Sequence, residues 1–358
     1  MPLDPAKPFN ELPLLPPAQD IESKVILKQA IGANRMLAEL KQKAHSLPNQ
    51  MVLINSLVLL EAKDSSEIEN IFTTHDKLYQ ADVMRDGVTD SSTKEVMRYR
   101  SALFAGVKAI QKRPLGTNVF VSICQRIKLT NEGIRNTSGT RIVTPTGKLI
   151  YTPPEGEELL RRLLKNLEEF MHKEDGVNSL IKMAVMHYQF EAIHPFTDGN
   201  GRTGRIANIL YLLEKGYLET PVLFLSRYII ENKNPYYLGL KNVTEKGAWE
   251  PWIVYMLEAV EQTAAQTIKR IEAIKQAMDR FSETLKEKGK KIYSKDLVEA
   301  AFTTPYFQVQ SVTQSLGVSR QTAAKYLLKL EKLGLITKKK VGRDVIYTNP
   351  SFTRALKN

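Results

Sequence analysis

The chain has 358 residues, of which 42% are hydrophobic and 25% charged. These values are typical of a soluble globular protein, and the length predicts two or three domains. No apolar run approaches the roughly 18 to 20 residues of a membrane helix, and the proline-rich start lacks the pattern of a secretory signal. Its single cysteine, Cys124, excludes an internal disulfide and a cysteine zinc cluster. We therefore expect a cytoplasmic protein with no membrane partner.

The net charge of +12 is concentrated near the C-terminus. Residues 281–358 contain 15 Lys and Arg against six Asp and Glu. This asymmetry indicates a basic segment that can meet a polyanion, although a solvated surface has a similar composition.

The N-terminal third is predicted to be an arm followed by helices. Residues 1–20 are rich in proline and should run extended. Apolar residues then recur every three or four positions over 21–47, which predicts an amphipathic helix that ends at Pro48. Further helices are predicted over about 50–62, 92–110 and 120–129.

The segment AKDSSEIENIFTT, residues 62–74, has two interpretations. Serine or aspartate followed by glutamate can cap the N-terminus of a helix, which would give this segment a purely structural role. The alternative is a regulatory role, which depends on the family resemblance of the chain.

The middle of the chain is predicted to contain a β-hairpin followed by strong helices. Residues 141–144 and 148–152 are β-favouring runs on either side of a Pro-Thr-Gly turn, and an exposed hairpin can pair with an extended peptide. Helical spacing then predicts helices over 159–171, 179–193 and 203–215. A long helix follows from about residue 249 past residue 280.

The C-terminal segment has the pattern of a winged helix-turn-helix. A short helix ends at Leu316, Gly317 makes a turn, Ser319 caps a longer helix, and strands over 335–339 and 344–348 form the wing. In this pattern the second helix enters a DNA major groove and a wing over 338–343 contacts phosphate, although such modules also serve as dimerisation or protein-docking units. The predicted DNA contacts are Arg320, Gln321, Lys325 and Arg343.

The most informative stretch is HPFTDGNGRTGR, residues 194–205. Gly199, Asn200 and Gly201 can take backbone conformations in which successive N–H groups converge on an anion. The helix that begins near Arg202 adds the positive end of its dipole at the same place. We therefore expect this loop to bind phosphate.

Side chains of the same stretch suit the chemistry of a metal-bound phosphate. Asp198 can hold Mg²⁺, and Arg202 and Arg205 can offer paired donors to phosphate or carboxylate oxygens. His194 can take a proton from an attacking hydroxyl, because histidine ordinarily titrates near neutrality. The combination predicts phosphoryl or nucleotidyl transfer to an alcohol.

Plainer interpretations and a zinc site compete with this hypothesis. A lone histidine before proline and a glycine-rich turn can both be structural. His187, Glu191 and His194 could form a metal trio, but these histidines are seven residues apart, whereas a helical zinc pair is spaced by four. The surrounding glycines and arginines suit an anion better than zinc.

The motif resembles the signature of the Fic family: His-Pro-Phe, any residue, Asp or Glu, Gly-Asn-Gly-Arg, two residues and Arg. Every fixed position is present in residues 194–205. The resemblance extends over nearly the whole chain and implies a mainly α fold, with a Fic helical core, a β-hairpin flap and a C-terminal winged helix-turn-helix domain. The implied parts are an arm and helical region over 1–110, a catalytic domain over 111–280 with the flap at 139–154, and the winged-helix domain over 281–358.

In that family the enzyme transfers AMP from ATP to a hydroxyl side chain of a protein. The resemblance implies that His194 deprotonates the target Tyr, Thr or Ser, that Asp198 holds Mg²⁺, and that Ile150 and Tyr151 on the flap dock the target. Gly201 favours AMP transfer, because relatives that transfer phosphate carry lysine there, while phosphocholine transfer stays open. The implied nucleotide-binding residues are Glu69, Asp198, Gly199, Asn200, Gly201, Arg202, Thr203, Gly204, Arg205, Tyr236 and Tyr237.

Fic proteins with an inhibitory helix carry Ser or Thr, three residues, Glu, then Gly or Asn. Ser65, Glu69 and Asn70 occupy these positions. The resemblance implies that Glu69 pairs with Arg205 and obstructs the γ-phosphate of ATP, which favours inhibition over capping as the role of this segment. The same glutamate could position water for removal of AMP.

Two functions follow from the sequence. The first is a self-inhibited protein adenylyltransferase that uses ATP and Mg²⁺ and modifies another protein or itself. The second is a nucleotide-sensing, DNA-binding transcription regulator whose Fic domain is weakly active or inactive. A homodimer is compatible with both.

Overall fold

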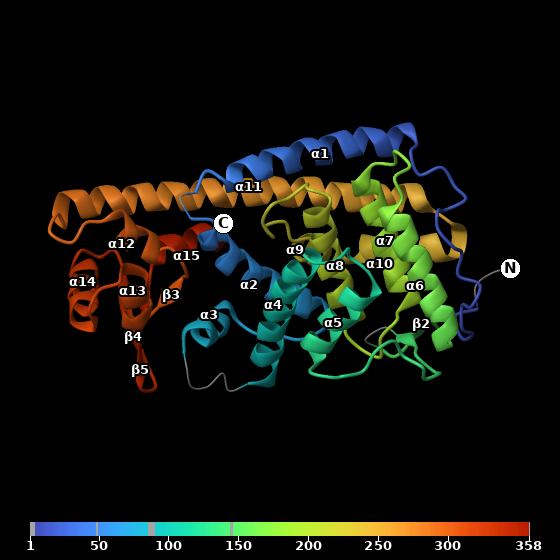
Figure 1. Cartoon of the computed structure of the whole chain (residues 1–358), viewed down its shortest axis with the longest axis horizontal. Helices are drawn as coiled ribbons and strands as arrows, with labels where there is room; N and C mark the ends of the chain where they lie inside the picture. The colour runs from blue at the N-terminus through green and yellow to red at the C-terminus, as the bar shows by residue number, and fades with distance from the viewer. Residues whose placement is uncertain (1–3, 48, 85–89, 144–145, 358) are drawn as a thin grey trace.

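The computed structural model describes residues 4–47, 49–84, 90–143 and 146–357, and it is mainly helical, with two small sheets in this part of the chain (Figure 1). No helix in the described ranges is long and apolar enough to cross a membrane. The helices are α1 Lys24–Ala44, α2 Met51–Ile68, α3 His75–Val83, α4 Ser91–Ile110, α5 Thr117–Lys128, α6 Glu157–His172, α7 Ser179–Ile193, α8 Asn200–Glu214, α9 Ser226–Glu231, α10 Lys233–Lys246, α11 Trp249–Lys288, α12 Lys295–Ala300, α13 Val309–Leu316, α14 Arg320–Lys332 and α15 Pro350–Lys357. The strands are β1 Ile142–Val143, β2 Leu149–Tyr151, β3 Tyr306–Phe307, β4 Thr337–Val341 and β5 Asp344–Thr348.

Helix α11 is the longest element, with 40 residues and a length of about 60 Å at 1.5 Å per residue. Figure 1 shows α1 lying along it. The hydroxyl of Ser23 caps α1, and the face that α1 turns to its neighbours is buried, as its three-and-four spacing predicts. The predicted helix over 21–47 is therefore confirmed with slightly shorter ends; Pro48 lies outside the described residues.

Helices α7 and α8 form the centre of the molecule. Nearly every side chain of α7 is buried, which is why its sequence is apolar all round instead of on one face. Helix α8 begins at Asn200, three residues before the predicted start at Thr203, because Gly199 takes a positive φ of 87° and turns the chain into the helix. The loop between the two helices is thus held from both sides.

Helix α2 is longer than predicted, and this corrects the capping hypothesis for Ser65 to Asn70. The helix was expected to end near residue 62, but it continues to Ile68. Glu69 is its C-terminal cap, and Asn70 has a positive φ of 61° that ends it. A serine-to-glutamate capping box belongs at a helix N-terminus, so the N-terminal capping interpretation is wrong.

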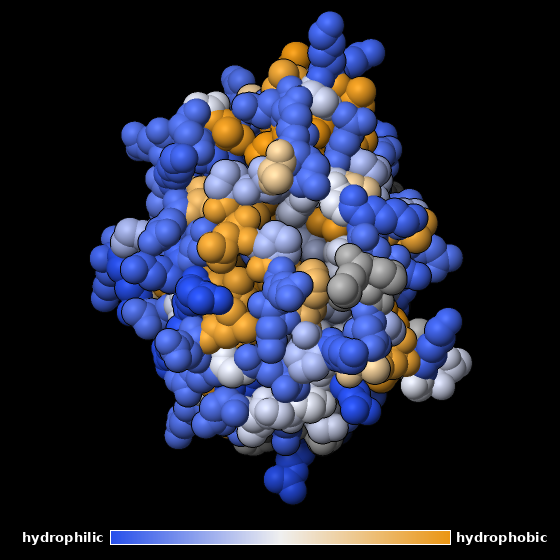
Figure 2. Space-filling view, turned by 90° about the vertical axis from the view of Figure 1, so that its right-hand side faces the viewer, coloured by the Kyte–Doolittle hydropathy of each residue, from blue (hydrophilic) through white to orange (hydrophobic). Residues whose placement is uncertain are grey.

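The predicted hairpin is present and short. Strands β1 and β2 pair antiparallel with an irregular register, while Thr144, at the end of the first predicted run, lies outside the described residues. The N-terminal arm runs beside the hairpin, because the Phe9 amide donates to the Thr152 carbonyl at 3.0 Å. Figure 2 shows this end of the molecule, where hydrophobic side chains gather near the middle of the face and hydrophilic ones surround them.

The C-terminal segment contains the predicted order of helix α13, a turn at Gly317, helix α14 and the hairpin β4–β5. Three further elements, α12, β3 and α15, were not predicted, and β3 completes a sheet of order β3-β5-β4. The winged-helix assignment and the division of the chain at residue 281, which falls within α11, stay predictions.

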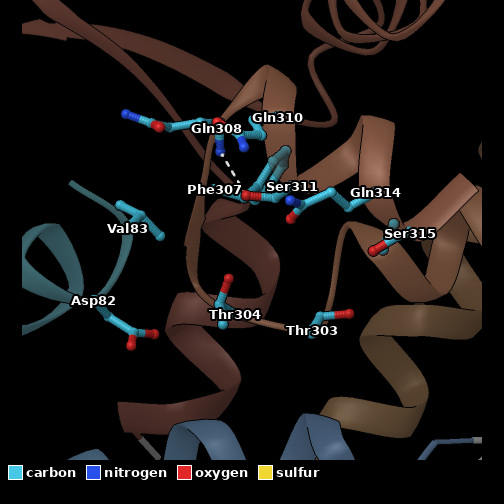
Figure 3. Close-up of a pocket in the computed structure, with 11 residues that line it drawn as sticks. Asp82, Val83, Thr303, Thr304, Phe307, Gln308, Gln310, Ser311, Gln314 and Ser315 are labelled. Atoms are coloured by element: carbon cyan, nitrogen blue, oxygen red, sulfur yellow. Dashed lines mark hydrogen bonds between the residues drawn. The ribbon is translucent and has the colours of Figure 1, made fainter. Parts of the chain in front are cut away.

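Helix α3, also unpredicted, contacts the C-terminal segment. The Tyr306 hydroxyl donates to the Asp76 carboxylate at 2.8 Å, and the Tyr79 and Tyr306 rings lie 5.5 Å apart. Beside this contact is a polar cavity of about 310 Å³ (Figure 3). Its lining includes Asp82 of α3 and, across the gap, Gln and Ser side chains of α13.

Candidate active site

His194 is the C-terminal cap of α7, and its backbone is left-handed with a φ of 50°. This conformation is uncommon for residues other than glycine, and it turns the chain sharply into the loop. The Asn200 amide bridges the loop, because it accepts from the Phe196 N–H at 2.9 Å and donates to the Phe196 carbonyl at 2.8 Å. Asn200 therefore shapes the predicted phosphate loop with its side chain.

Arg135 holds the backbone around His194. Its Nε donates to the His194 carbonyl at 2.8 Å, and its Nη2 donates to the carbonyl of Pro154, at the end of the flap, at 2.6 Å. Its own N–H donates to the Pro195 carbonyl at 2.9 Å. One buried guanidinium thus ties the flap to the loop.

The imidazole of His194 is neutral at physiological pH. Burial lowers its pKa to about 4, and the charge of Arg135 acts in the same direction. Its Nδ1 makes no hydrogen bond of normal geometry in the described residues, although the nearby Glu191 carbonyl favours protonation. A neutral ring keeps one nitrogen unprotonated, as a general base requires.

Asp198 is the most exposed charged side chain of the loop, with 61% of its side chain accessible. Lys128 contacts its Oδ2 at 2.6 Å. Partial burial opposes ionisation, but the hydrogen bond and charge of Lys128, aided by Arg202, hold the pKa of Asp198 below its usual value. A cavity of about 220 Å³ opens beside this carboxylate, with Cys124 and Thr197 in its wall.

Arg202 lies inside the protein and faces α4. Only 1% of its side chain is exposed, and its Nη1 contacts the Glu95 carboxylate at 2.6 Å, while Asp198 is 3.7 Å away. Lys128 contacts the same Glu95 at 3.2 Å. This network fixes the start of α8 against α4.

Arg205 is buried and bound to the end of α2. Its Nε donates to the Ser65 hydroxyl, and its Nη2 donates to the Ser65 carbonyl and to Oε1 of Glu69, each at 2.8 Å. Burial alone would lower the pKa of this guanidinium, but the charge of Glu69 outweighs it and raises the pKa. The residues of the predicted inhibitory motif and the last arginine of the loop are thus brought together across 140 positions.

Gly201 gives Glu69 the room for this contact. A Cβ built at residue 201 would overlap Oε1 of Glu69 and would lie 2.9 Å from the Arg205 guanidinium. The second glycine of the motif therefore leaves open a space that the Glu69 carboxylate fills.

Two carboxyl groups flank Arg205: that of the buried Glu61 and that of the half-buried Glu191. Glu61, one turn before Ser65, accepts hydrogen bonds from Tyr99 at 2.9 Å and Ser226 at 2.6 Å. Burial raises the pKa of both Glu61 and Glu191 to about 7. The hydrogen bonds from Ser226 and Tyr99, followed by the charge of Arg205, limit the rise for Glu61, and the charge of Arg205 limits it for Glu191. Both groups therefore exchange protons near neutral pH.

The zinc trio of the sequence is not assembled. His187 contacts the Tyr236 hydroxyl through Nε2 at 2.9 Å and the Asn208 amide through Nδ1 at 3.1 Å, and burial lowers its pKa to about 3. Across the described ranges, no three His, Cys, Asp or Glu side chains form a cluster that could hold a metal. His187 is a core residue.

The remaining predicted site residues divide between core and surface. Tyr236 is buried against His187, whereas the next residue, Tyr237, is 45% exposed. On the flap, Tyr151 is buried and donates to the Ala192 carbonyl at 3.0 Å, whereas Ile150 is exposed. Of the two flap residues, Ile150 is thus the one that faces outward. Thr203 and Gly204 lie buried in the first turn of α8.

Sequence reasoning missed four residues of this site: Arg135, Lys128, Glu95 and Glu61. Their contacts to the loop and to α9 span 59 to 165 positions in the chain. No local spacing encodes such contacts, and only the charge of each residue could have drawn attention to it.

Comparison with known families covers most of the chain. Residues 27–108 match the Fic/DOC family N-terminal region, residues 118–212 match the Fic/DOC family, and residues 277–352 match the C-terminal domain of the protein adenylyltransferase SoFic-like group.

Curated relatives are similar over shorter stretches. Protein adenylyltransferase fic-1 of Caenorhabditis elegans is 29% identical over 120 residues, which is 33% of this chain and 22% of the relative. Protein adenylyltransferase Fic of Nematostella vectensis is 29% identical over 114 residues, which is 32% of this chain and 25% of the relative. The match thus spans about a quarter of these relatives' length.

Solved structures share the fold over a larger part of the chain. A Fic family protein from Desulfovibrio desulfuricans G20 superposes with a TM-score of 0.58 at 18% identity, covering 94% of this chain and 98% of that one. Fic-1 residues 134–508 of C. elegans give a TM-score of 0.51 at 20% identity, covering 69% and 74%. The family matches, the curated relatives and the shared fold agree: the chain belongs to the Fic/DOC family.

Proposed function

We propose that the chain is a protein adenylyltransferase that moves AMP from ATP to a hydroxyl side chain of a protein. The observation that carries the proposal is the α7–α8 loop, which joins a neutral His194, an exposed Asp198 and the buried Arg205. The curated relatives bear the name protein adenylyltransferase, which supports the same reaction.

In this reaction His194 accepts the proton of the target hydroxyl. The oxygen then forms a bond to the α-phosphorus of ATP, and the bond to the bridging oxygen breaks, so that pyrophosphate leaves. Because burial lowers the pKa of His194 to about 4, the ring is unprotonated at neutral pH and one nitrogen has a lone pair for this proton. Arg135 orients this ring by fixing the backbone on which it stands.

The residues present fit Mg²⁺ bound together with ATP. Asp198 offers an exposed, ionised carboxylate near the N-terminus of α8, and Mg²⁺ is usually held by one or two carboxylates plus phosphate oxygens. When bound, the ion would neutralise charge that develops on the phosphates. Lys128, now 2.6 Å from Asp198, would have to share or release that carboxylate.

We further propose that Glu69 inhibits the transfer. Its carboxylate pairs with Arg205 at 2.8 Å and fills the space beside Gly201, where a γ-phosphate would otherwise meet the guanidinium. A charge-assisted pair in a shielded site is strong enough to compete with a phosphate oxygen. With 37% of its side chain exposed, Glu69 can also reach water, which supports a second role in removing AMP.

The test is transfer of label from ATP labelled on the α-phosphate, with Mg²⁺, to protein. We expect weak labelling by the natural chain, stronger labelling by Glu69→Gly, and none by the double variant Glu69→Gly, His194→Ala. Unchanged labelling on Glu69→Gly would reject inhibition, and labelling that survives His194→Ala would reject the assigned base.

A nucleotide-sensing, DNA-binding regulator is the second candidate, and the exposed cations of α14 and β4 favour it. In that case Glu69→Gly transfers no label, while DNA binding responds to ATP. The intact His194 and Arg205 make active transfer the better supported function.

A further inference from the structure

One end of the molecule carries cations without acidic partners. Helix α14 and the hairpin β4–β5 lie together at this end, and the hairpin projects away from the helical body (Figure 1). Residues 320–343 contain eight Lys and Arg and a single acidic residue, Glu331. These cations are exposed, and in the part of the chain that the structure describes they form no ion pair: Arg320, Lys325, Lys329, Lys332, Lys338, Lys339, Lys340 and Arg343.

Helix α14 separates an apolar face from a basic one. Ala323, Leu327 and Leu330 are buried against the rest of the segment. The opposite side exposes Gln321, Lys325 and Lys329, together with Ala324 and the half-exposed Leu328. A straight helix of 13 residues with such a face has the dimensions that the major groove of B-form DNA admits.

The hairpin adds a second set of cations. In β4 the three lysines 338–340 are all exposed, and Gly342 and Arg343 form the tight turn to β5. Lysine on an edge strand such as β4 also prevents pairing with other chains. Protection of the edge strand explains the lysines of β4 but not the cations of α14. A single anionic partner that contacts both elements explains both sets of cations.

We propose that α14 and the β4–β5 hairpin bind double-stranded DNA, with α14 in the major groove and the hairpin on the phosphate backbone. The inference deepens the DNA partner of the second candidate function and holds whether or not the Fic site transfers AMP. Duplex DNA is preferred to duplex RNA, because the A-form major groove is too narrow and deep for a helix.

The test measures binding of the full chain to a fluorescent 30-base-pair DNA duplex over a range of salt concentrations. We expect the logarithm of the affinity to fall linearly with the logarithm of salt, with a slope of about −0.9 per phosphate contact. Replacing Lys338, Lys339 and Lys340 by Gln should weaken binding at least tenfold and make the slope shallower by about 2 to 3. Single-stranded DNA and duplex RNA should bind more weakly than duplex DNA.

A matched variant removes the same charge from the opposite end of the molecule. Lys24, Lys28 and Arg162 are exposed and unpaired among the described residues, so replacing them by Gln should leave DNA affinity and slope nearly unchanged. Equal loss in both triple variants, absence of duplex binding at low salt, or tighter binding of RNA would overturn the proposal. Label transfer by Glu69→Gly is measured separately, so a failure of DNA binding and a failure of AMP transfer can be told apart.

Discussion

Two adjacent serines at the end of α2 have different contacts. The Ser65 hydroxyl accepts a hydrogen bond from Arg205, whereas the Ser66 hydroxyl is equally buried but has no hydrogen-bond partner among the described residues. If the contacts of Arg205 hold Glu69 in place, Ser65→Ala should raise label transfer by about tenfold or more, because a hydrogen bond to a charged group contributes about 1.5 to 3 kcal/mol. The rise should be smaller than that of Glu69→Gly, and initial labelling rates measure both.

Ser66→Ala is the control, since it removes the same atom without a bond to Arg205. It should leave labelling near the natural level. A comparable rise in both serine variants would mean that the effect comes from a loosened helix and not from the Arg205 contact.

If His194 is the base, its proton affinity should set the pH dependence of transfer. Its pKa is lowered to about 4, so the neutral form that accepts a proton prevails above that pH and is lost as the pH falls through about 4. The labelling rate of Glu69→Gly should therefore lack an acidic limb near 6.5, the ordinary value of histidine. The charge of Arg135 lowers the pKa of His194, so Arg135→Met should move the acidic limb of the pH profile to higher pH.

Glu191 faces the same site, and its pKa of about 7 could add a separate limb near neutrality. Glu191→Gln removes that group and isolates the titration of His194. A limb that stays near 6.5, the ordinary pKa of histidine, in this variant would contradict a neutral His194.

At the scale of elements, the sequence predicted the helices whose apolar residues are regularly spaced. Helices α1 and α6 follow this rule closely. The end of α2 was misjudged, because the polar run that begins at Lys63 looks like a loop, yet Ser65 and Ser66 are buried by contacts with distant parts of the chain. Helix α3 was missed since only two of its nine residues are buried.

Helix α3 lies between Glu69 and the C-terminal segment. It begins five residues after Asn70, and the hydroxyl of Tyr306 holds it through Asp76. Tyr306→Phe removes this hydrogen bond, which contributes about 0.5 to 1.5 kcal/mol. The loss should make the contact between Glu69 and Arg205 less stable. We expect label transfer to rise by about tenfold at most in the natural background and to stay unchanged when Glu69 is already glycine.

Tyr326→Phe serves as the comparison, because Tyr326 of α14 makes no side-chain hydrogen bond in the described residues. It should not change labelling in either background. An effect of Tyr306→Phe that persists with Glu69→Gly would place its origin outside the contact between Glu69 and Arg205.

At the scale of the whole molecule, the motif 194–205 predicted the loop but not the distant residues that hold the loop in place. The glycines, Asp198 and His194 are contiguous in sequence and could be interpreted together. Arg135 and Glu95 reach the loop from other helices and loops, and their roles exist only after the chain has folded. A continuous apolar core, from Leu12 to Leu356, joins the two ends of the chain, and its contacts likewise exist only after folding.

This continuous core predicts that the chain unfolds as one cooperative unit. Trp249 and Trp252, the two tryptophans of the chain, lie beside α7, so their fluorescence reports the Fic end, while circular dichroism reports all helices. Phe302 is fully buried in the C-terminal segment and packs edge-on against Phe281 of α11, with ring centroids 5.4 Å apart. Phe302→Ala should cost about 3 to 5 kcal/mol and lower the denaturation midpoint by both probes together.

Leu328→Ala provides the matched control on the same segment, because half of the Leu328 side chain is exposed and its loss leaves no buried cavity. Its free energy of unfolding should change by no more than about 0.5 kcal/mol, the range of ordinary surface substitutions. If Phe302→Ala splits the transition, so that fluorescence keeps its original midpoint while part of the dichroism is lost earlier, the C-terminal segment unfolds on its own. In that outcome α11 would connect two independent units, and the contact between α3 and Tyr306 could not carry a signal to Glu69.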